Sequence, residues 1–187
     1  VIGTDVSPEM LSVAQQKATV KNADMLFLCQ NITQLNLYGT IICTVCTLDS
    51  LNHLKNLDEI KKVFSLVSLF TEEGGIFVFD VNTLYKHKKV LGNNAFIYEN
   101  GDALCAWQNS LDGDTVNIEL DFFAEADNGL YERYSESFSE RAYELCDIED
   151  ALTEAGFEII GIYDGYDNSP ISDNSQRAVF AARKGKN

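Results

Sequence analysis

The sequence predicts an α/β fold in which a mostly parallel, doubly wound sheet carries an antiparallel insert. Three observations support this prediction. Short apolar runs alternate with helical patterns over residues 1–82, which is the order that builds a parallel sheet. Over residues 95–143 the runs become short, alternating and aromatic, as in antiparallel hairpins, and the first pattern then returns. We therefore expect a discontinuous domain of residues 1–94 and 144–187, with residues 95–143 as an inserted subdomain.

The predicted elements of the parallel part are strand, helix, strand, strand, helix and strand, at residues 1–5, 8–20, 25–29, 40–46, 58–70 and 76–81. Ser7 can cap the first helix, and Pro8 suits its first position, where no amide hydrogen is needed. The strand runs are apolar or β-branched, as buried parallel strands are. Gly74 and Gly75 are predicted to end the second helix.

The insert is predicted to contain three or four antiparallel strands, near residues 96–98, 104–107, 116–123 and 131–138. Turn sequences separate them, at Asn100-Gly101-Asp102, Asp112-Gly113-Asp114 and Asp127-Asn128-Gly129. After the insert we expect a helix over residues 147–155, ended by Gly156, and strands at 157–163 and 177–183. Because no helical pattern lies between these two strands, they should be antiparallel neighbours.

The composition limits the classes of function that need to be considered. The chain has 187 residues, of which 45% are hydrophobic, so one domain with a sizeable core is expected. Its net charge of −15 repels the phosphate backbone, which argues against nucleic acid as a partner. Sixteen acidic residues lie between Glu99 and Glu154, as a solvated face or as a mouth that favours a cationic or neutral substrate. No apolar run is long enough for a membrane span.

The five cysteines are predicted to be reduced thiols of a cytoplasmic protein, since their number is odd and most lie in apolar runs. Cys43 and Cys46 have CxxC spacing, but in a strand this spacing points the two side chains to opposite faces. With His53 and His87 as the two histidines, no zinc-binding cluster is expected.

Ligands of open α/β sheets bind beyond the carboxyl ends of the strands, so the residues that follow each strand are candidates for chemistry. Asp5 can accept hydrogen bonds from both hydroxyls of a ribose, or it only caps the adjacent helix. Asn31 offers an amide to an adenine edge, or it is an ordinary loop residue. A polar cluster lies where a reacting group would be bound, or serves as the turn before the next helix; it comprises Asp49, Ser50, Asn52 and His53.

Six segments, in order and at suitable spacing, together resemble one enzyme family. They are residues 3–11 (GTDVSPEML), 29–32 (CQNI), 49–54 (DSLNHL), 74–80 (GGIFVFD), 131–134 (YERY) and 154–157 (EAGF). The chain resembles the class I S-adenosylmethionine (SAM) dependent methyltransferases over nearly its whole length, and within them a bacterial branch called YqeM-like. The resemblance implies a Rossmann-like sheet with an antiparallel last strand and an inserted antiparallel β lid.

The resemblance also implies roles for particular residues. Asp5 would hold the SAM ribose, and the rest of the cofactor would be contacted by Met10, Asn31, Ile32, Cys46, Thr47 and Leu48. The substrate side would be formed by Asp49, Ser50, Asn52 and His53, with Trp107 and Tyr134 from the lid. Each of these two aromatic residues alternatively belongs to the insert's own small core. The catalytic residue is not identified; Asp49 and His53 are the candidates, although the family often has Tyr in place of His53, and no metal is needed.

The glycine-rich cofactor loop of this family has no counterpart in the sequence, nor have the strand before it and the helix after it. We therefore expect the chain to be an N-terminally incomplete fragment that binds SAM weakly or not at all. The absent strand would pair with the strand that ends at Asp5, so we also expect unpaired apolar strand edges.

The function expected from the resemblance is SAM-dependent methyl transfer to an unidentified small molecule by the complete enzyme. Three alternatives remain open. The acidic, aromatic insert would suit a non-catalytic interaction module, or the chain is a degenerate remnant of the enzyme. An oxidoreductase that uses NAD would also place an acid after its second strand, but the antiparallel closing strand argues against it.

Overall fold

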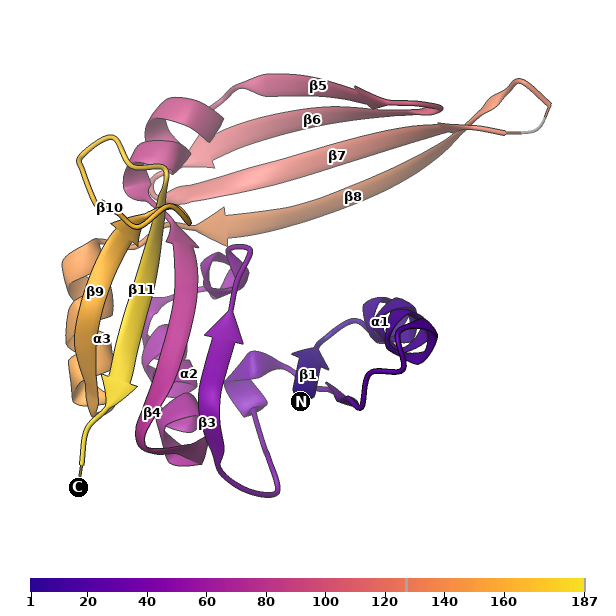
Figure 1. The fold of residues 1–187 in the computed structure, drawn as a ribbon. Helices are drawn as coiled ribbons and strands as arrows, with labels where there is room; N and C mark the ends of the chain where they lie inside the picture. Colours follow the sequence, from indigo (N-terminus) through magenta and orange to yellow (C-terminus); the bar gives the residue numbers. More distant parts are fainter. Residues whose placement is uncertain (127, 187) are drawn as a thin grey trace.

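The computed structural model describes residues 1–126 and 128–186, and its strands form three separate sheets (Figure 1). The first sheet has two parallel strands, β1 (Ile2–Asp5) and β2 (Leu26–Cys29). Helix α1 (Pro8–Val20) connects them. Ser7 Oγ accepts a hydrogen bond from the Met10 amide, so the predicted helix cap is confirmed.

The second sheet has five strands in the order β10-β9-β11-β4-β3. They are β3 (Ile41–Cys46), β4 (Thr71–Asn82), β9 (Phe157–Asp164), β10 (Ser169–Pro170) and β11 (Arg177–Lys184). β3 and β4 are parallel, whereas β11 is antiparallel to both β4 and β9. The α/β class and the antiparallel pairing of the two closing strands are therefore confirmed, since a loop without a helix connects β9 to β11.

Two helices, α2 (Leu57–Phe70) and α3 (Leu145–Glu154), pack on one face of this sheet and close the main core. Phe64 of α2 lies against Phe79 of β4, which stacks on Phe180 of β11 with 4.9 Å between ring centroids. All three rings are fully buried, so they form part of a closely packed core. No helix among the described residues has the length and apolar character needed to cross a membrane.

The end of α2 differs from the prediction. The helix ends at Phe70 and Thr71 begins β4, so Gly74 and Gly75 lie in the strand rather than at the end of the helix. Gly74 has a φ of 77°, and a Cβ on Gly75 would lie 2.7 Å from Thr71 Cγ2. The two glycines therefore let the chain bend where β4 starts, which is a tertiary requirement that resembles a helix stop in the sequence.

The third sheet projects from the five-stranded sheet, and we call it the arm (Figure 1). Its strands are antiparallel and in sequence order: β5 (Ala95–Asn100), β6 (Ala103–Asp112), β7 (Thr115–Glu125) and β8 (Tyr131–Arg141). Gly101 and Gly113 have φ values of 60° and 61°, as the predicted hairpin turns require. Asp127, in the third predicted turn, lies outside the described residues.

The two faces of the arm have different surroundings. One face carries Ile118, which packs with Leu91 of the short π-helix η3 (Lys86–Leu91). The opposite face carries Asp121, which accepts two hydrogen bonds from Arg133. Because neighbouring strand residues alternate between faces, the face of Ile118 is turned towards the body of the molecule and the face of Asp121 towards solvent.

The N-terminal block, defined here as residues 1–31, is loosely packed. The structure describes the whole block, and Ala18 is its only buried side chain. No strand pairing among the described residues joins β1 to β3. Among the described residues β1 pairs with β2 and β3 with β4, so one edge of each of β1 and β3 is unpaired, as expected for the strand that ends at Asp5, and Ile42 and Val45 on β3 are 70% and 63% exposed.

Candidate functional site

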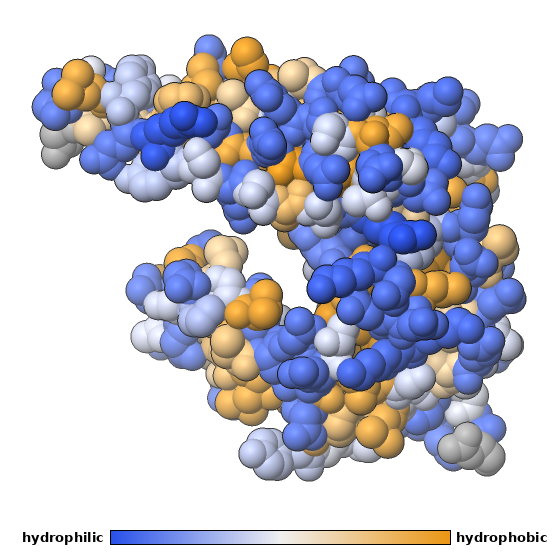
Figure 2. Space-filling model, turned by 180° about the vertical axis from the view of Figure 1, so that it is seen from behind, coloured by the Kyte–Doolittle hydropathy of each residue, from blue (hydrophilic) through white to orange (hydrophobic). Residues whose placement is uncertain are grey.

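A hollow in the surface separates the arm from the N-terminal block. Figure 2 shows this hollow from behind. The short helix η2 (Ser50–His53), which follows β3, lies against the arm, since the rings of His53 and Phe138 are 5.3 Å apart. The polar cluster predicted from the sequence is thus brought to the base of the arm.

The loop between β3 and η2 has an uncommon backbone. Leu48 and Asp49 have left-handed φ values of 59° and 53°, although neither is glycine. Their amides donate to Oδ2 and Oδ1 of Asp80, at 2.9 and 2.7 Å. Asp80 belongs to β4 and is fully buried. The loop is therefore held on a buried carboxylate.

Two further donors reach the same carboxylate. Arg177 of β11 donates to Asp80 Oδ1 at 2.5 Å, and the Tyr166 hydroxyl donates to Oδ2. Burial opposes the charge of Arg177, but Asp80 and Asp49 outweigh burial and raise the pKa of the guanidinium. Burial and the hydrogen bond to Asp80 raise the pKa of Tyr166, which keeps its hydroxyl a donor. Asp80 thus has four hydrogen-bond donors around it.

Asn82, at the end of β4, links the loop to the arm. Its Nδ2 donates to Asp49 Oδ2 at 2.6 Å and to Glu140 Oε2 at 2.9 Å. Its Oδ1 accepts from Lys86 Nζ at 2.8 Å. The amide presents donors to two carboxylates and an acceptor to an ammonium, so only one amide orientation satisfies all three neighbours. Burial and the nearby Arg177 lower the pKa of Lys86.

Glu140 is buried at the base of the arm beside His87. His87 Nε2 lies 3.7 Å from Glu140 Oε2, which is too far for a hydrogen bond, and Nδ1 is 3.2 Å from the Asp114 carbonyl. Burial raises the pKa of Glu140, but the adjacent His87 and Asn82 outweigh it, and the net pKa lies below the usual value. Although acidic groups and a histidine meet here, no group of three His, Cys, Asp or Glu side chains among the described residues could hold a metal ion.

Asn52 lies inside the protein rather than at the surface of the hollow. It is fully buried, its Oδ1 accepts from the Asn82 amide at 2.8 Å, and its Nδ2 donates to the carbonyls of Asn82 and Arg141. These bonds join η2 to β4 and to β8. The placement differs from the predicted contact with substrate, because a buried amide with these partners clamps three elements together.

The other residues of the loop differ in exposure. Burial raises the pKa of the Cys46 thiol to about 11, although Ser50 opposes the shift, so the thiol stays neutral near pH 7. The Ser50 hydroxyl donates to the Thr47 carbonyl at 2.9 Å. Leu48 is 71% exposed, and His53 is also exposed. Thr47, Leu48, Ser50 and His53 are therefore the residues of the loop and η2 that are open to a ligand.

The predicted cofactor residues of the N-terminal block remain accessible. Asp5 Oδ1 accepts from the Ser7 amide at 2.8 Å, just before α1, and no donor among the described residues reaches Oδ2. Asn31 caps η1 (Ile32–Gln34) through its Oδ1, and the first residue of η1 packs partly against the main core. Met10 is 60% exposed. These hydrogen bonds leave one polar atom of Asp5 and one of Asn31 available.

The two aromatic residues predicted to line a substrate pocket lie on the arm face that is turned towards the body. Trp107 packs against Phe96, 5.7 Å between ring centroids, and belongs to the arm's own small core. Tyr134 is 57% exposed and donates its hydroxyl to Glu132. Tyr134 is four residues along β8 from Phe138, or about 13 Å. Trp107 is thus placed as the core alternative expects, whereas Tyr134 is open to a ligand.

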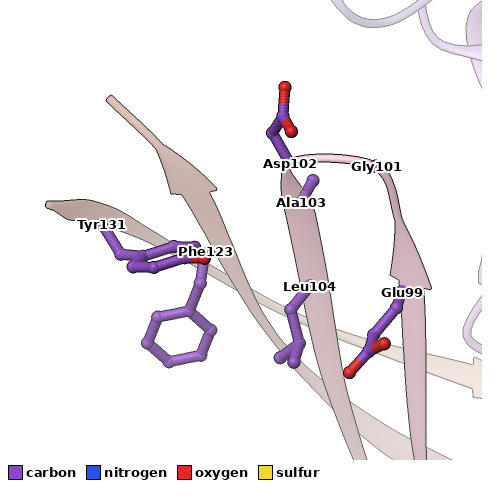
Figure 3. A pocket seen from close by; sticks show the side chains of 7 residues that line it. All are labelled: Glu99, Gly101, Asp102, Ala103, Leu104, Phe123 and Tyr131. Atoms are coloured by element: carbon purple, nitrogen blue, oxygen red, sulfur yellow. The ribbon is translucent and has the colours of Figure 1, made fainter. Parts of the chain in front are cut away.

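A cavity of about 470 Å³ lies at the end of the arm where β5 turns into β6, away from the carboxyl ends of β1, β2 and β3 (Figure 3). Leu104, Phe123 and Tyr131 are among the residues that line it. The strand register places Leu104 and Phe123 opposite each other and on the face that Trp107 does not share. The cavity is therefore on the solvent side of the arm and is separate from the candidate site.

Sequence reasoning missed the residues that tie the site together. Asp80 and Asn82 stand at the end of a predicted strand, so their position is a usable signal. Lys86, Glu140 and Arg177 approach the loop from distant parts of the chain, and no local pattern indicates that they meet.

Comparison with known proteins adds family relationships to this geometry. The family described as "Methyltransferase domain" matches residues 1–79. A candidate methyltransferase of Geobacillus sp. (strain WCH70) is 33% identical over 187 residues, covering 98% of this chain and 75% of that protein. The candidate methyltransferase YqeM of Bacillus subtilis (strain 168) is 30% identical over 192 residues, covering 100% of this chain and 76% of YqeM.

Two solved structures show how far the similarity extends in three dimensions. A SAM-dependent methyltransferase from Clostridium acetobutylicum ATCC 824 is 34% identical, with a TM-score of 0.93, and the match covers 99% of this chain and 75% of that one. The sugar N-methyltransferase KedS8 from Streptoalloteichus sp ATCC 53650 is 17% identical, with a TM-score of 0.80 and coverage of 99% and 71%. At 17% identity the likeness concerns the fold alone.

Proposed function

The chain belongs to the SAM-dependent methyltransferases, and we propose that it holds SAM at the carboxyl ends of β1, β2 and β3. On this proposal the methyl group is transferred to a small molecule that is bound beneath the arm. The similarity to these relatives confirms the family and the cofactor that were predicted from the sequence. The observation that carries the proposal is the Asp49 loop, which ends a parallel strand and is tied to the base of the arm. On this proposal residues 1–94 and 144–187 bind the cofactor, and residues 95–143 cover the acceptor.

The residues at the strand ends fit the chemistry of SAM. Oδ2 of Asp5 is available to a ribose diol, and Nδ2 of Asn31 is available to an adenine edge. Neutral or apolar contacts would come from Met10, Ile32, Cys46, Thr47 and Leu48. When bound, SAM supplies a methyl group that is activated by its sulfonium. The protein's own task is then to bind and align the acceptor.

Asp49 and His53 are the candidate catalytic residues on the acceptor side. Asn82 donates to the Asp49 carboxylate, and Arg177 lies 3.5 Å from it, so its direction is fixed. A carboxylate held in this way can orient an acceptor hydroxyl or amine. His53 is exposed beside Phe138 and can take the proton that the acceptor loses. Ser50 lies next to Asp49 and is the third group available to the acceptor.

We infer that the acceptor is cationic or neutral rather than anionic. Glu136 and Glu140 share the arm face that is turned towards the body. The nearby cations, Lys86 and Arg177, are already engaged, by Asn82 and Asp80 respectively. An anionic acceptor would therefore be repelled. KedS8, by its name, methylates a nitrogen of a sugar, and an amino sugar is an acceptor of the proposed kind.

Isothermal titration with SAM tests the cofactor part of the proposal. Asp5→Asn should weaken binding about tenfold, because a hydrogen bond from a hydroxyl to a charged group is worth about 1.5 kcal/mol. Asp24→Asn removes another exposed acid of the same block and should leave binding unchanged. Equal affinity of the two variants would count against the role of Asp5. The titration of the unaltered chain also tests the sequence-based expectation that it binds SAM weakly or not at all.

Transfer of label from methyl-labelled SAM tests the acceptor part. We expect label in amino sugars or neutral sugars and none in sugar phosphates, because Glu136 and Glu140, on the arm face that is turned towards the body, repel the phosphate. Transfer to sugar phosphates alone would contradict the proposed charge preference.

A further inference from the structure

The Leu48–Asp49 turn is a strained segment at the centre of the candidate site. Two consecutive left-handed residues without glycine are unfavourable, because each Cβ crowds the following carbonyl oxygen. Leu48 also exposes 71% of its side chain, so burial of that side chain does not compensate. Such a conformation persists only where the surroundings impose it.

Asp80 supplies the hydrogen-bond acceptors for the two amides of this turn. A left-handed turn points consecutive amide hydrogens to one side, where they form a site for an anion. The Asp80 carboxylate occupies that position, with one oxygen accepting from Leu48 and the other from Asp49. Each hydrogen bond is charge-assisted, and the carboxylate is fully buried, so both bonds are strong.

The charge of Asp80 is itself compensated by the fold. Arg177 and Tyr166 donate to it from the C-terminal part of the chain. Arg177 also lies 3.5 Å from Asp49 Oδ2, and Asn82 Nδ2 donates to the same oxygen. The backbone of the turn and the side chain of Asp49 are therefore fixed by one connected set of groups.

We propose that Asp80 is a positioning residue for methyl transfer: it binds the amides of Leu48 and Asp49 as a protein binds an anion, and so fixes the Asp49 carboxylate and the Leu48 side chain at the hollow. This inference rests on the proposed function of the loop. A merely structural role, as the partner of Arg177, would not depend on the left-handed backbone. That difference makes the two roles separable.

Asp80→Asn is the first variant, because asparagine keeps the shape but has one acceptor oxygen and turns an N–H towards a backbone N–H. We expect the Asp49 amide to exchange its hydrogen at least tenfold faster, and the affinity for S-adenosylhomocysteine, used as the probe in titration calorimetry, to fall about tenfold. Unchanged exchange at Asp49 in this variant would overturn the proposal.

Rescue at position 48 separates positioning from charge pairing. In the Asp80→Asn background, Leu48→Gly lets the turn adopt positive φ without strain and should restore part of the lost affinity and protection. Leu48→Ala is the matched control, since it removes the same side chain but keeps the Cβ, and it should restore neither. Equal results for glycine and alanine would mean that Asp80 only neutralises Arg177, which overturns the proposal.

Tyr166→Phe covers the case in which Asp80→Asn does not fold. Tyr166 is 63% exposed, and its loss removes one of the donors to Asp80 without removing charge. We expect a change in exchange at the Leu48 amide, which donates to the same oxygen of Asp80, by a smaller factor than in Asp80→Asn, and no change there would count against the proposal. If the unaltered chain binds no S-adenosylhomocysteine, the proposed function fails, and amide exchange at Asp49 still decides whether Asp80 positions the turn.

Discussion

The two halves of the candidate site rest on parts of the molecule that differ in packing. The N-terminal block carries Asp5 and Asn31 on a framework in which Ala18 is the only buried side chain. The Asp49 loop rests on the main core, where rings such as Phe79 are 0% exposed. Both parts have regular strands and capped helices, so hydrogen bonding does not distinguish them.

We therefore expect burial, rather than regular secondary structure, to set the local stability of the two parts. A helix of 13 residues such as α1 is marginal alone and needs an apolar face packed on something else. The block offers little such packing, so it should open far more readily than the five-stranded sheet. On the proposed function, the acceptor side of the site therefore rests on a buried core, whereas the cofactor side rests on the loosely packed N-terminal block.

The largest expected effect comes from the core itself. Phe79→Ala should lower the free energy of unfolding of the five-stranded sheet by about 3–5 kcal/mol, because it leaves a cavity between Phe64 and Phe180. Val13→Ala in α1, at a side chain 43% exposed, should change it by less than about 0.5 kcal/mol. Urea unfolding followed by far-UV circular dichroism measures both. Similar losses for the two variants would break the proposed contrast between the halves.

Loss of the hydrogen bonds of Asn52 should have the next largest effect on the free energy of unfolding. Asn52→Ala leaves the Asn82 amide and the Arg141 carbonyl without their partner, and we expect a loss of about 2–3 kcal/mol. Ser50→Ala, in the same turn but exposed, should cost less than about 1 kcal/mol. Hydrogen exchange should show the loss at the base of the arm and not in the N-terminal block. A loss confined to the block would contradict this prediction.

A pair of glycines provides a smaller, matched test of the same contrast. Gly75→Ala would place a Cβ 2.9 Å from the backbone oxygens of Glu72 and Ile42, so β4 must shift, at a cost of about 1–3 kcal/mol. Gly3→Ala would meet the Phe27 ring at 3.0 Å, but a side chain in the loosely packed block can move aside. Thermal unfolding of the two variants should therefore show a lower midpoint for Gly75→Ala. Equal midpoints would show that the block is packed as tightly as the sheet.

The smallest expected effect is a dependence on pH at the base of the arm. The pKa of Glu140 lies below its usual value of 4.5 in the folded protein, so its ionised form stabilises the fold. That stabilisation is complete above pH 4.5 and is lost as the pH falls through the lower, folded-state value. Hydrogen exchange at β8 should accelerate over this acid range. Glu140→Gln should remove the dependence, and a variant that keeps it would assign the effect to another group.

Sequence and structure differ, or the sequence leaves two roles open, where tertiary packing overrides a local signal. Gly74 and Gly75 have the composition of a helix stop, but they serve the bend into β4. Asn52 has the polarity of a site residue, but the fold buries it. The sequence left Trp107 either in a pocket or in the arm's own core, and the structure packs it in that core. In each case the residue type is compatible with both roles, and only the neighbours decide between them.

The sequence by itself determined the order of the elements, the cap of α1, the antiparallel closing strands and the family, because periodicity, capping and short motifs are properties of neighbouring residues. The tertiary structure alone decided that Asp80 holds the Leu48–Asp49 turn and that Asn82 connects Asp49 to Glu140. These partners are 31 to 58 positions apart in the chain. No local pattern records such pairings, since they arise only when the sheet and the arm close around the same buried charges.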